Sequence, residues 1–311
     1  MLKEWVKDDH ITLVANDAYW GTAPAIKTII FRPIPETSTA ISELKSGGVD
    51  VITNVPPEQM DGLNTDTTKV VAKATDRLFY INVNTLEEGP LQNKLVRQAI
   101  AYAIDVDAIN ESLLGGMAQR TAINLPLEAF GYDASLTPYE YNPEKARQLV
   151  SESSYNGEVL EYELKSGYYT FGNEAAEAIV AMWKEIGVNA QIVFRDTKEY
   201  NNVSNWSNTM RFPDPSAGLW LLWGPGSTPA ENTWLDMPQE FIDAGKEMSS
   251  IIDPVRRKAL SKKLMTIWRE EAPGALLYYP YESWGIRDGL EWTPYSSQAM
   301  DFRAGNFKLA K

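Results

Sequence analysis

The sequence contains no cysteine and a single histidine, His10. The absence of cysteine excludes disulfide bonds, cysteine-ligated zinc and a thiol nucleophile. A Ser–His–Asp triad or a carboxylate–histidine metal site would have to use His10, and no clustered partner stands near it in the sequence. We therefore predict no catalytic residue, no metal site and no cofactor, and we interpret His10 as a polar residue at the start of a strand.

Two further shortages narrow the class of protein. No apolar run approaches the ~20 residues that a membrane-spanning helix needs, and the first nine residues lack the charged and apolar regions of a signal peptide. The 29 basic residues are outnumbered by 42 acidic ones, which gives a net charge of −13. Because this charge repels nucleic acid and anionic membrane, nucleic acid is not expected as a partner.

What is present is ordinary globular composition, with 44% hydrophobic and 23% charged residues. The 311 residues are enough for about two domains. The 10 tryptophans and 15 tyrosines are abundant. Such numbers serve hydrophobic cores, but also flat and adaptable ligand-binding surfaces.

Helical and strand patterns alternate along the chain, which predicts an α/β fold. Cap residues and Asn-Pro or Asp-Pro starts set several helix boundaries. The predicted helices cover residues 36–46, 93–114 (with a second helix from Asp105), 142–151, 173–186 and 253–271, and the main predicted strands cover 49–55, 69–74, 77–83, 159–164, 188–194 and 275–281.

Residues 201–237 form a contrasting segment that is rich in proline and glycine and is predicted to be irregular. A long irregular segment inside a compact domain is usually functional or disordered. The segment contains four tryptophans, and this aromatic content argues against disorder. We therefore look for binding residues here.

Several short motifs stand in a fixed order along the chain. They are residues 16–21 (NDAYWG), 44–51 (LKSGGVDV), 96–105 (VRQAIAYAID), 141–146 (YNPEKA) and 183–188 (WKEIGV). In this order they resemble the family 5 extracellular solute-binding proteins, which include the dipeptide, oligopeptide and nickel binding components of ABC importers. Residues 299–306 (AMDFRAGN) are similar to the end of one subgroup of that family. The resemblance runs from about residue 9 to residue 307.

The resemblance implies an α/β, two-lobed fold of the type II periplasmic-binding-protein kind. Family members are much longer and begin with an export signal, so the chain is expected to be a C-terminal portion that lacks the N-terminal part of lobe I and a small extra domain. Residues 1–90 are then a partial lobe I, residues 91–281 the larger C-terminal lobe, and residues 282–311 a return to lobe I.

The resemblance also implies a function. The chain is expected to be the solute-binding component of an ABC importer, or a fragment of one, and not an enzyme. It would capture a small organic solute, such as a peptide, an oligosaccharide or an anionic conjugate, and deliver it to a membrane permease. The full-length protein is expected to be periplasmic and monomeric. The alternative is a carbohydrate-active hydrolase, which needs two carboxyl groups ~5–9.5 Å apart in an aromatic cleft.

Peptide-binding members of the family hold the ligand's amino group with an aspartate four residues before a proline, and Arg211 stands at the matching position before Pro215. A guanidinium repels an ammonium group and attracts a carboxylate or phosphate. Arg211 is therefore a candidate for binding an anionic solute. The alternative is a surface arginine paired with a nearby acid.

The other candidate ligand-binding residues are aromatic or amide side chains. Indole faces stack on sugar rings or apolar groups, whereas the alternative for the tryptophans of the apolar run 219–223 is the core. The amides either hydrogen-bond a polar ligand or shape turns, and the tyrosines either end a strand at a cleft or pack a loop. These candidates are Trp206, Asn205, Asn208, Tyr168, Tyr169, Trp220 and Trp223.

Overall fold

The computed structural model describes residues 1–127, 129–166, 168–169, 171–197, 199, 202–209, 212–234, 237–296, 300–303 and 305–309, with the backbone alone for residues 208 and 228–230. The chain divides into two compact units. Unit 1 combines Met1–Thr75 with Tyr281–Lys311, and unit 2 is the continuous stretch Asp76–Pro280.

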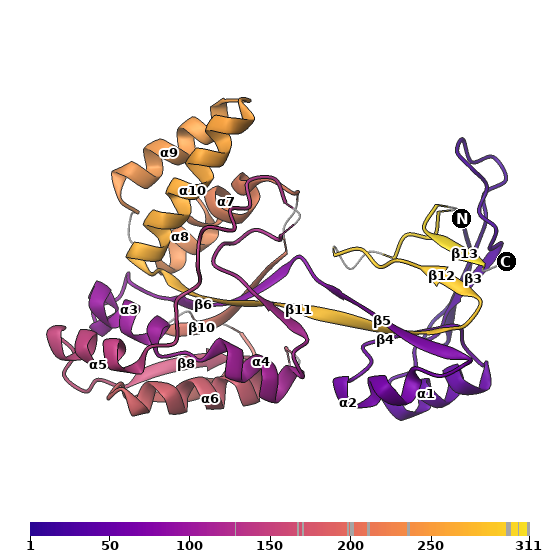
Figure 1. The fold of residues 1–311 in the computed structure, drawn as a ribbon, viewed down its shortest axis with the longest axis horizontal. Helices are drawn as coiled ribbons and strands as arrows, with labels where there is room; N and C mark the ends of the chain where they lie inside the picture. Colours follow the sequence, from indigo (N-terminus) through magenta and orange to yellow (C-terminus); the bar gives the residue numbers. More distant parts are fainter. Residues whose placement is uncertain are drawn as a thin grey trace. The chain divides into compact units, whose positions relative to one another are not determined.

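Unit 2 is built on a mixed sheet with the strand order β11-β6-β10-β8-β9 (Figure 1). Strand β6 pairs antiparallel with β10 on one side and with β11 on the other, while β8 runs parallel to both β10 and β9. The short strand β7 pairs with β11. The bounds are β6 (Arg77–Val83), β7 (Ala118–Arg120), β8 (Leu160–Leu164), β9 (Ala190–Phe194), β10 (Val203–Thr209) and β11 (Gly274–Arg287).

The helices of unit 2 begin where the sequence supplies a cap. Asn93, Asp105 and Asn142 each accept a hydrogen bond from a backbone N–H of the first turn, which satisfies a donor that has no partner inside the helix. Asp253 does the same for the longest helix. The helices are η2 (Pro90–Gln92), α3 (Lys94–Tyr102), α4 (Val106–Leu114), α5 (Pro143–Glu152), α6 (Gly172–Glu185), the π-helical turn η3 (Ser216–Trp220), α7 (Leu221–Trp223), α8 (Thr228–Thr233), α9 (Gln239–Ser250) and α10 (Pro254–Glu271).

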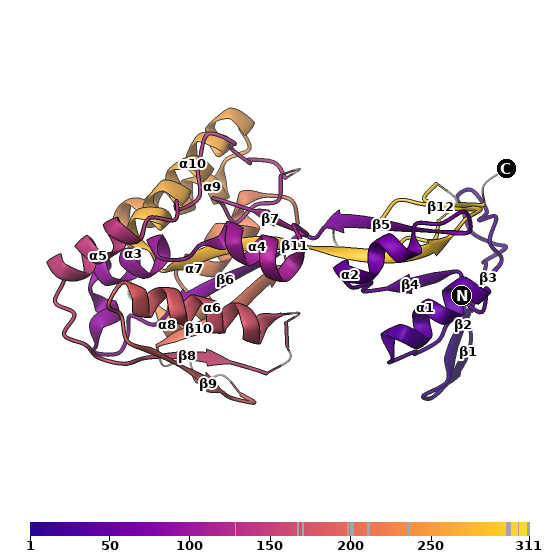
Figure 2. The ribbon, with the colours of Figure 1, turned by 60° about the horizontal axis from the view of Figure 1, so that its bottom comes forward.

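Helices cover both faces of this sheet (Figures 1 and 2). On one face Trp183 of α6 packs against Tyr162 of β8, with ring centroids 5.4 Å apart. On the other face Trp223 lies between Tyr80 of β6 and Trp268 of α10, at 5.7 and 5.3 Å. All five side chains are at most 2% exposed, so the large aromatics fix the spacing between the sheet and its helices.

Unit 1 contains two smaller layers. The strands β4 and β5 pair with the end of β11, and α1 packs its Leu44 against Ile52 of β4. A separate three-stranded sheet has the order β1-β2-β3, and β12 pairs with β13. The bounds are β1 (Leu2–Val6), β2 (His10–Val14), β3 (Thr28–Phe31), α1 (Thr37–Ser46), β4 (Val51–Thr53), α2 (Pro57–Met60), η1 (Asp61–Leu63), β5 (Thr68–Ala74), β12 (Leu290–Trp292) and β13 (Phe307–Leu309).

The predicted α/β class is confirmed, and the helices expected at 36–46, 93–114, 142–151, 173–186 and 253–271 are present with end shifts of a few residues. The prediction that 201–237 is irregular was wrong in part. Residues 203–209 form β10, because all seven pair in register with β6. Helix α9 was not predicted.

The division of the chain also differs from the expected domain limits at one point. The first limit was predicted at residue 90, whereas the structure divides the chain after Thr75. The difference is β6, which pairs with β10 and β11 and so belongs to unit 2. The assignment of these units to the lobes of a longer protein stays a prediction.

Candidate functional site

The central strand β10 carries three of the predicted ligand-binding residues, and its geometry separates them. Asn205 pairs with Ile81 and Trp206 with Tyr80 of β6. Because successive side chains on a strand point to opposite faces, the Asn205 amide and the Trp206 indole point away from each other. Asn205 shares its face with Ser207, and Trp206 shares the opposite face with Tyr80. The amide and the indole therefore do not form one site.

On the face of Asn205, hydroxyl groups from neighbouring elements converge on β10. The Tyr162 hydroxyl of β8 donates a hydrogen bond to Asn205 Oδ1. The Tyr169 hydroxyl, from the loop before α6, donates to Ser207 Oγ at 3.1 Å. Asn205 thus binds a side chain of the neighbouring strand and does not shape a turn. The alternative that it is a turn residue is therefore wrong.

Burial keeps these phenols protonated. Desolvation raises the pKa of Tyr162 well above its ordinary value and also raises the pKa of Tyr169. At neutral pH both side chains are therefore neutral hydrogen-bond donors. They can orient a polar group, but they do not supply a charge.

Aromatic rings surround the Tyr169–Ser207 pair. The ring of Phe79 lies 4.5 Å from that of Tyr169 and 5.8 Å from that of Tyr278. Tyr168, whose side chain is 57% exposed, packs edge-on against Tyr169 at 4.8 Å. The tyrosine pair thus combines one solvent-facing ring with one ring packed over the sheet. We call the four residues Phe79, Tyr168, Tyr169 and Tyr278 the aromatic cluster.

The cavity beneath this cluster is small. It measures about 20 Å³, and its lining includes Phe79, Tyr169 and Tyr278 of the cluster, residues Asn205 and Trp206 of β10, and residues of α6. A volume of this size holds about one water molecule, whereas ligand pockets usually measure about 300–1,000 Å³. The cluster therefore offers a solute a surface with polar and aromatic groups, and not an enclosed pocket.

The other two tryptophans serve packing in this structure. Trp223 is 1% exposed and lies in the core of unit 2, so it offers no surface to a ligand. Trp220 is half-buried, with its ring 6.4 Å from that of Phe241 and packed against the backbone of Gly245 in α9. Trp223 thus takes a position in the core, which was the alternative to ligand binding for the tryptophans of residues 219–223.

Two predicted residues lie wholly or partly outside the described part of the chain. Arg211 lies outside the described residues. Asn208 lies in β10 opposite Leu78, so it is a strand residue and not a turn residue, but its side chain is also outside the described part of the chain.

The segment after Arg211 is held by a half-buried ion pair that the sequence did not reveal. Asp214 accepts two hydrogen bonds from Arg257 of α10, at 2.6 and 2.7 Å, and one from the backbone N–H of Ser216 at 3.0 Å. Partial burial raises the pKa of Asp214, but the bonds from Ser216 and Arg257 outweigh it, and the net pKa is lowered. This pair anchors the start of η3 to the long helix.

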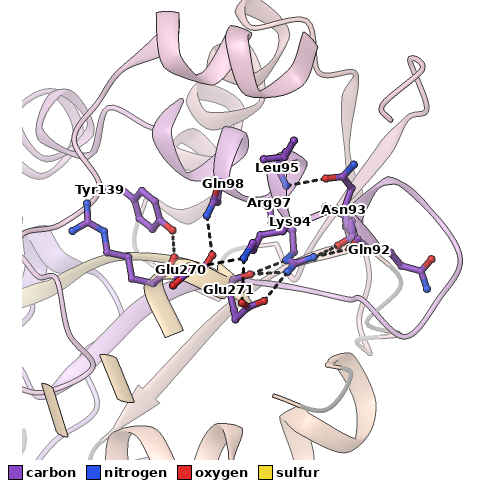
Figure 3. Close-up of polar contacts among 11 residues, drawn as sticks. Gln92, Asn93, Lys94, Leu95, Arg97, Gln98, Tyr139, Glu270 and Glu271 are labelled. Atoms are coloured by element: carbon purple, nitrogen blue, oxygen red, sulfur yellow. Dashed lines mark hydrogen bonds and ion pairs between the residues drawn. The ribbon is translucent and has the colours of Figure 1, made fainter. Parts of the chain in front are cut away.

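A second polar cluster surrounds Arg97 of α3 (Figure 3). Its guanidinium, 5% exposed, donates to the carbonyl of Glu271 at 3.0 and 2.7 Å and to the carbonyls of Leu91 and Gln92 at 2.9 and 3.0 Å. It also lies 4.8 Å from the centre of the Trp234 ring. Desolvation lowers the pKa of Arg97 to about 10, so it stays charged at neutral pH and ties the end of α10 to the start of α3.

Among the described residues, no group of three or more His, Asp or Glu side chains is placed to hold a metal ion. Within the same residues, no helix has both the length and the apolar character needed to cross a membrane.

Sequence reasoning missed Phe79, Ser207 and Tyr278, which the structure brings next to Tyr169. Phe79 and Tyr278 lie in stretches that were predicted as strands, but only the pairing of β6 with β10 and β11 shows which of their side chains share a face. No signal within a single strand carries that register.

Comparison with known proteins identifies relatives over nearly the whole chain. The family model described as bacterial extracellular solute-binding proteins, family 5 Middle, matches residues 1–230. The dipeptide-binding protein of Escherichia coli (strain K12) is 28% identical over 292 residues, which cover 89% of this chain and 54% of the relative. The oligopeptide-binding protein AppA of Bacillus subtilis (strain 168) is 26% identical over 347 residues, covering 99% and 61%. The chain thus spans between about half and three-fifths of the length of these relatives.

Solved structures agree with this assignment. The periplasmic binding protein DppA from Helicobacter pylori, in complex with the peptide STSA, superposes with a TM-score of 0.81 at 25% identity, covering 100% of this chain and 62% of that one. NikA from Brucella suis, in complex with Fe(III)-EDTA, has the same fold with a TM-score of 0.86 at 18% identity, covering 99% and 67%. The predicted periplasmic-binding-protein-like fold class is confirmed. This chain belongs to family 5 of the bacterial extracellular solute-binding proteins.

Proposed function

We propose that this chain binds a small organic solute as a component, or part of a component, of an ABC importer, and that it delivers the solute to a membrane permease. The match of the family model to residues 1–230 carries the proposal. The relatives named above are all binding proteins. Delivery by a binding protein needs different contacts in its open and closed states, and it needs no bond to be made or broken. The whole protein would act outside the cytoplasmic membrane, in keeping with the family's description as extracellular.

The aromatic cluster is the surface of unit 2 that best suits such a solute. Tyr168 presents an exposed ring face, and Tyr169 holds its hydroxyl toward Ser207. Rings of this kind stack on sugar or apolar groups, and their hydroxyls orient polar ones. The small cavity favours contact with one face of the solute and not its enclosure.

Arg211 supports an anionic or sugar-like solute over a peptide with a free amino group. A desolvated guanidinium beside an ammonium group would cost several kcal/mol, by the reasoning that makes unpaired buried charges expensive. Carboxylate-bearing conjugates and oligosaccharides avoid this repulsion. The proposal therefore disfavours free-amine peptides bound in the register that peptide-binding relatives use.

Titration calorimetry with the 311-residue chain tests both parts of the proposal. Unblocked dipeptides and tripeptides, the same peptides with acetylated amines, and short oligosaccharides are compared. We expect blocked peptides or oligosaccharides to bind, and we expect Arg211→Ala and Tyr169→Ala to weaken that binding. The control is Arg147→Ala on α5, an exposed arginine that contacts the Glu144 carboxylate at 3.5 Å and donates to the Glu185 carbonyl at 3.3 Å.

Two results would contradict the proposal. Tight binding of unblocked peptides that Arg211→Ala leaves unchanged would refute the solute class. The absence of binding to every compound in the panel would refute solute capture by this chain. Release of product from chromogenic glycosides, lost on replacing a single carboxylate, would instead support the hydrolase alternative, which the named relatives do not favour.

A further inference from the structure

The loop between α5 and β8 contains Asn156 and Gly157, the single Asn-Gly pair of the sequence (Figure 1). Both residues are exposed. Gly157 has a φ of +87°, in the left-handed region that favours glycine, and a Cβ atom added to it would meet no described atom within 4 Å. The peptide bond that joins the two residues therefore lies in open surroundings at the surface of unit 2.

In the described part of the chain, the two groups of this pair that could react with each other make no hydrogen bond. They are the side-chain amide of Asn156 and the backbone N–H of Gly157. Hydrogen bonds hold only the atoms beside them. The backbone N–H of Asn156 donates to Glu158 Oε2 at 2.8 Å, and the carbonyl of Gly157 accepts from Asn189 Nδ2 at 3.1 Å. The reacting groups are thus exposed and available, while the loop around them is ordered.

Two side chains tie this loop to the first residues of β8 and β9, and we call Tyr155 and Asn189 the loop clamp. The Tyr155 hydroxyl donates to the carbonyl of Glu158 at 2.6 Å and accepts from the backbone N–H of Asn189 at 2.7 Å. The carbonyl of Asn189 accepts from the backbone N–H of Leu160 at 2.9 Å. A displacement of the Gly157 carbonyl, which Asn189 also holds, would therefore reach the start of both strands.

An asparagine that precedes a glycine can close a five-membered ring. The nitrogen of Gly157 attacks Cγ of Asn156, a C–N bond forms, the bond from Cγ to Nδ2 breaks, and ammonia leaves with the proton of the Gly157 N–H. Water then opens the cyclic imide at either of its two carbonyl carbons. The products are aspartate and isoaspartate, in which the backbone runs through Cγ. Proximity favours such an intramolecular attack, and glycine hinders it least because it has no Cβ.

We propose that Asn156 is a site of spontaneous covalent modification, at which the exposed amide is converted into aspartate and isoaspartate. Isoaspartate lengthens the backbone between residues 156 and 157 by one carbon, which moves the Gly157 carbonyl away from Asn189 and opens the loop clamp. The new carboxylate also lies near that of Glu158, and the two negative charges repel each other. The proposal does not depend on the solute-binding function, because the loop precedes β8 whereas Tyr168 and Tyr169 follow it.

Other pairs in the chain fit this chemistry less well. Asp61 and Asp288 also precede a glycine, but an ionised carboxylate is a poorer target for a nitrogen nucleophile than an amide is. Asn189 is exposed, but its side-chain amide and its backbone N–H are both hydrogen-bonded. It also precedes Ala190, which is 4% exposed and begins β9. Asn189 therefore serves as the internal control.

The test incubates the 311-residue chain in mildly alkaline buffer and quantifies its tryptic peptides by mass spectrometry. Residues 148–165 form one such peptide, in which Asn156 is the only asparagine. We expect this peptide to be lost progressively into two deamidated forms that separate by chromatography, one aspartyl and one isoaspartyl. The peptide of residues 185–195, which contains Asn189, should stay unchanged. Mildly acidic buffer should slow the conversion, because fewer Gly157 N–H groups are deprotonated there.

The matched variant is Asn156→Gln, which keeps the amide but would have to close a six-membered ring. It should abolish the conversion and leave the circular dichroism unchanged, because the replaced side chain is exposed. Hydrogen exchange at the Leu160 N–H should be faster in the converted chain than in the fresh chain or in Asn156→Gln. The proposal is overturned if the 148–165 peptide stays unmodified, if Asn189 is converted as fast as Asn156, or if conversion leaves the exchange at Leu160 unchanged.

Discussion

Arg97 is a buried charge whose partners are mostly backbone carbonyls. Its guanidinium serves three carbonyl groups at the ends of two segments, and these carbonyls belong to helix ends that lack partners within their own helix. Asp214 and Arg257 show the same use of charge between η3 and α10. Charged residues in unit 2 thus stabilise helix ends. Their residue types alone do not distinguish this structural role from ligand binding.

We expect Arg97→Met to lower the free energy of unfolding by about 2–4 kcal/mol. The methionine fills similar volume but leaves the carbonyls of Leu91, Gln92 and Glu271 without their donor, and buried unsatisfied polar groups are costly. The control is Arg147→Met, an exposed arginine whose loss should cost about 0–0.5 kcal/mol. Urea denaturation followed by circular dichroism measures both, and equal effects of the two variants would contradict this role for Arg97.

His10 gives a second prediction at this scale. Hydrogen bonds to Asp9 at 2.8 Å and to Glu4 at 3.4 Å raise its pKa above 6.5. Because the folded pKa is raised, the stability that His10 contributes is fully present below the unfolded pKa of about 6.5 and is lost as the pH rises through the folded value.

The chain has one histidine, so a proton NMR titration gives a single imidazole signal to follow. We expect its midpoint to lie above 6.5 and to fall in Glu4→Gln. A midpoint at or below 6.5 in the unaltered chain would show that these contacts do not persist in solution.

Residue type alone predicted part of the candidate site. Tyrosine and asparagine types pointed to Tyr169 and Asn205, and both lie on the face of β10 that carries the aromatic cluster. Trp206 and Trp223 were candidates as well, but alternation along β10 places the side chain of the first on the opposite face, and burial removes the second. Composition identifies side chains able to bind a ligand, whereas their direction depends on strand register, which involves residues distant in the sequence.

At the scale of elements, local signals located most helices, and strand pairing overrode them elsewhere. The capped helices α3, α4, α5 and α10 begin where Asn or Asp stands before them. Strand β10, with the sequence VSNWSNT, lacks the alternation of apolar residues that indicates a strand. It is a strand because it lies between β6 and β8, and this context could not be predicted from its own residues.

Helix α9 depends on a close approach at Gly245. A Cβ atom built at this position would overlap the Trp220 ring. Alanine normally stabilises a helix relative to glycine by about 0.5–1 kcal/mol, but here overpacking should dominate and cost about 1–3 kcal/mol. We therefore expect Gly245→Ala to destabilise the chain.

The matched control is Gly62→Ala in η1, where an added Cβ would meet no atom within 4 Å. It should be neutral or slightly stabilising. Thermal unfolding of the two variants measures the difference, and a Gly245→Ala variant as stable as the Gly62→Ala variant would show that α9 can move away from Trp220.

At the scale of the whole molecule, the two units differ in how the chain builds them. Unit 2 is continuous from Asp76 to Pro280, while unit 1 joins residues from both ends of the chain. The largest cluster of buried apolar residues lies entirely in unit 2, whereas the two clusters described in unit 1 are much smaller. A continuous segment with its own core is the kind that folds independently.

We accordingly expect a polypeptide of residues 76–280 to fold on its own, with a cooperative thermal transition and near-ultraviolet circular dichroism typical of packed tryptophans. The polypeptide 1–75, which lacks the residues that pair with β4 and β5, should not. A non-cooperative transition for residues 76–280 would mean that its core needs contacts from the rest of the chain.

Strand β11 serves both units, because its first half pairs with β6 and β7 and its second half with β5 and β4. A single-residue deletion in most of this strand would therefore shift side chains from one face to the other in the pairing with β6 and β7 or in the pairing with β4 and β5. Leu277 is different, since it is the extra residue of a bulge between Leu276, opposite Tyr80, and Tyr278, opposite Phe79. Evolution can remove a residue there and keep both flanking registers. Among homologous sequences we accordingly expect differences in the length of β11 to occur at the bulge and not elsewhere in the strand.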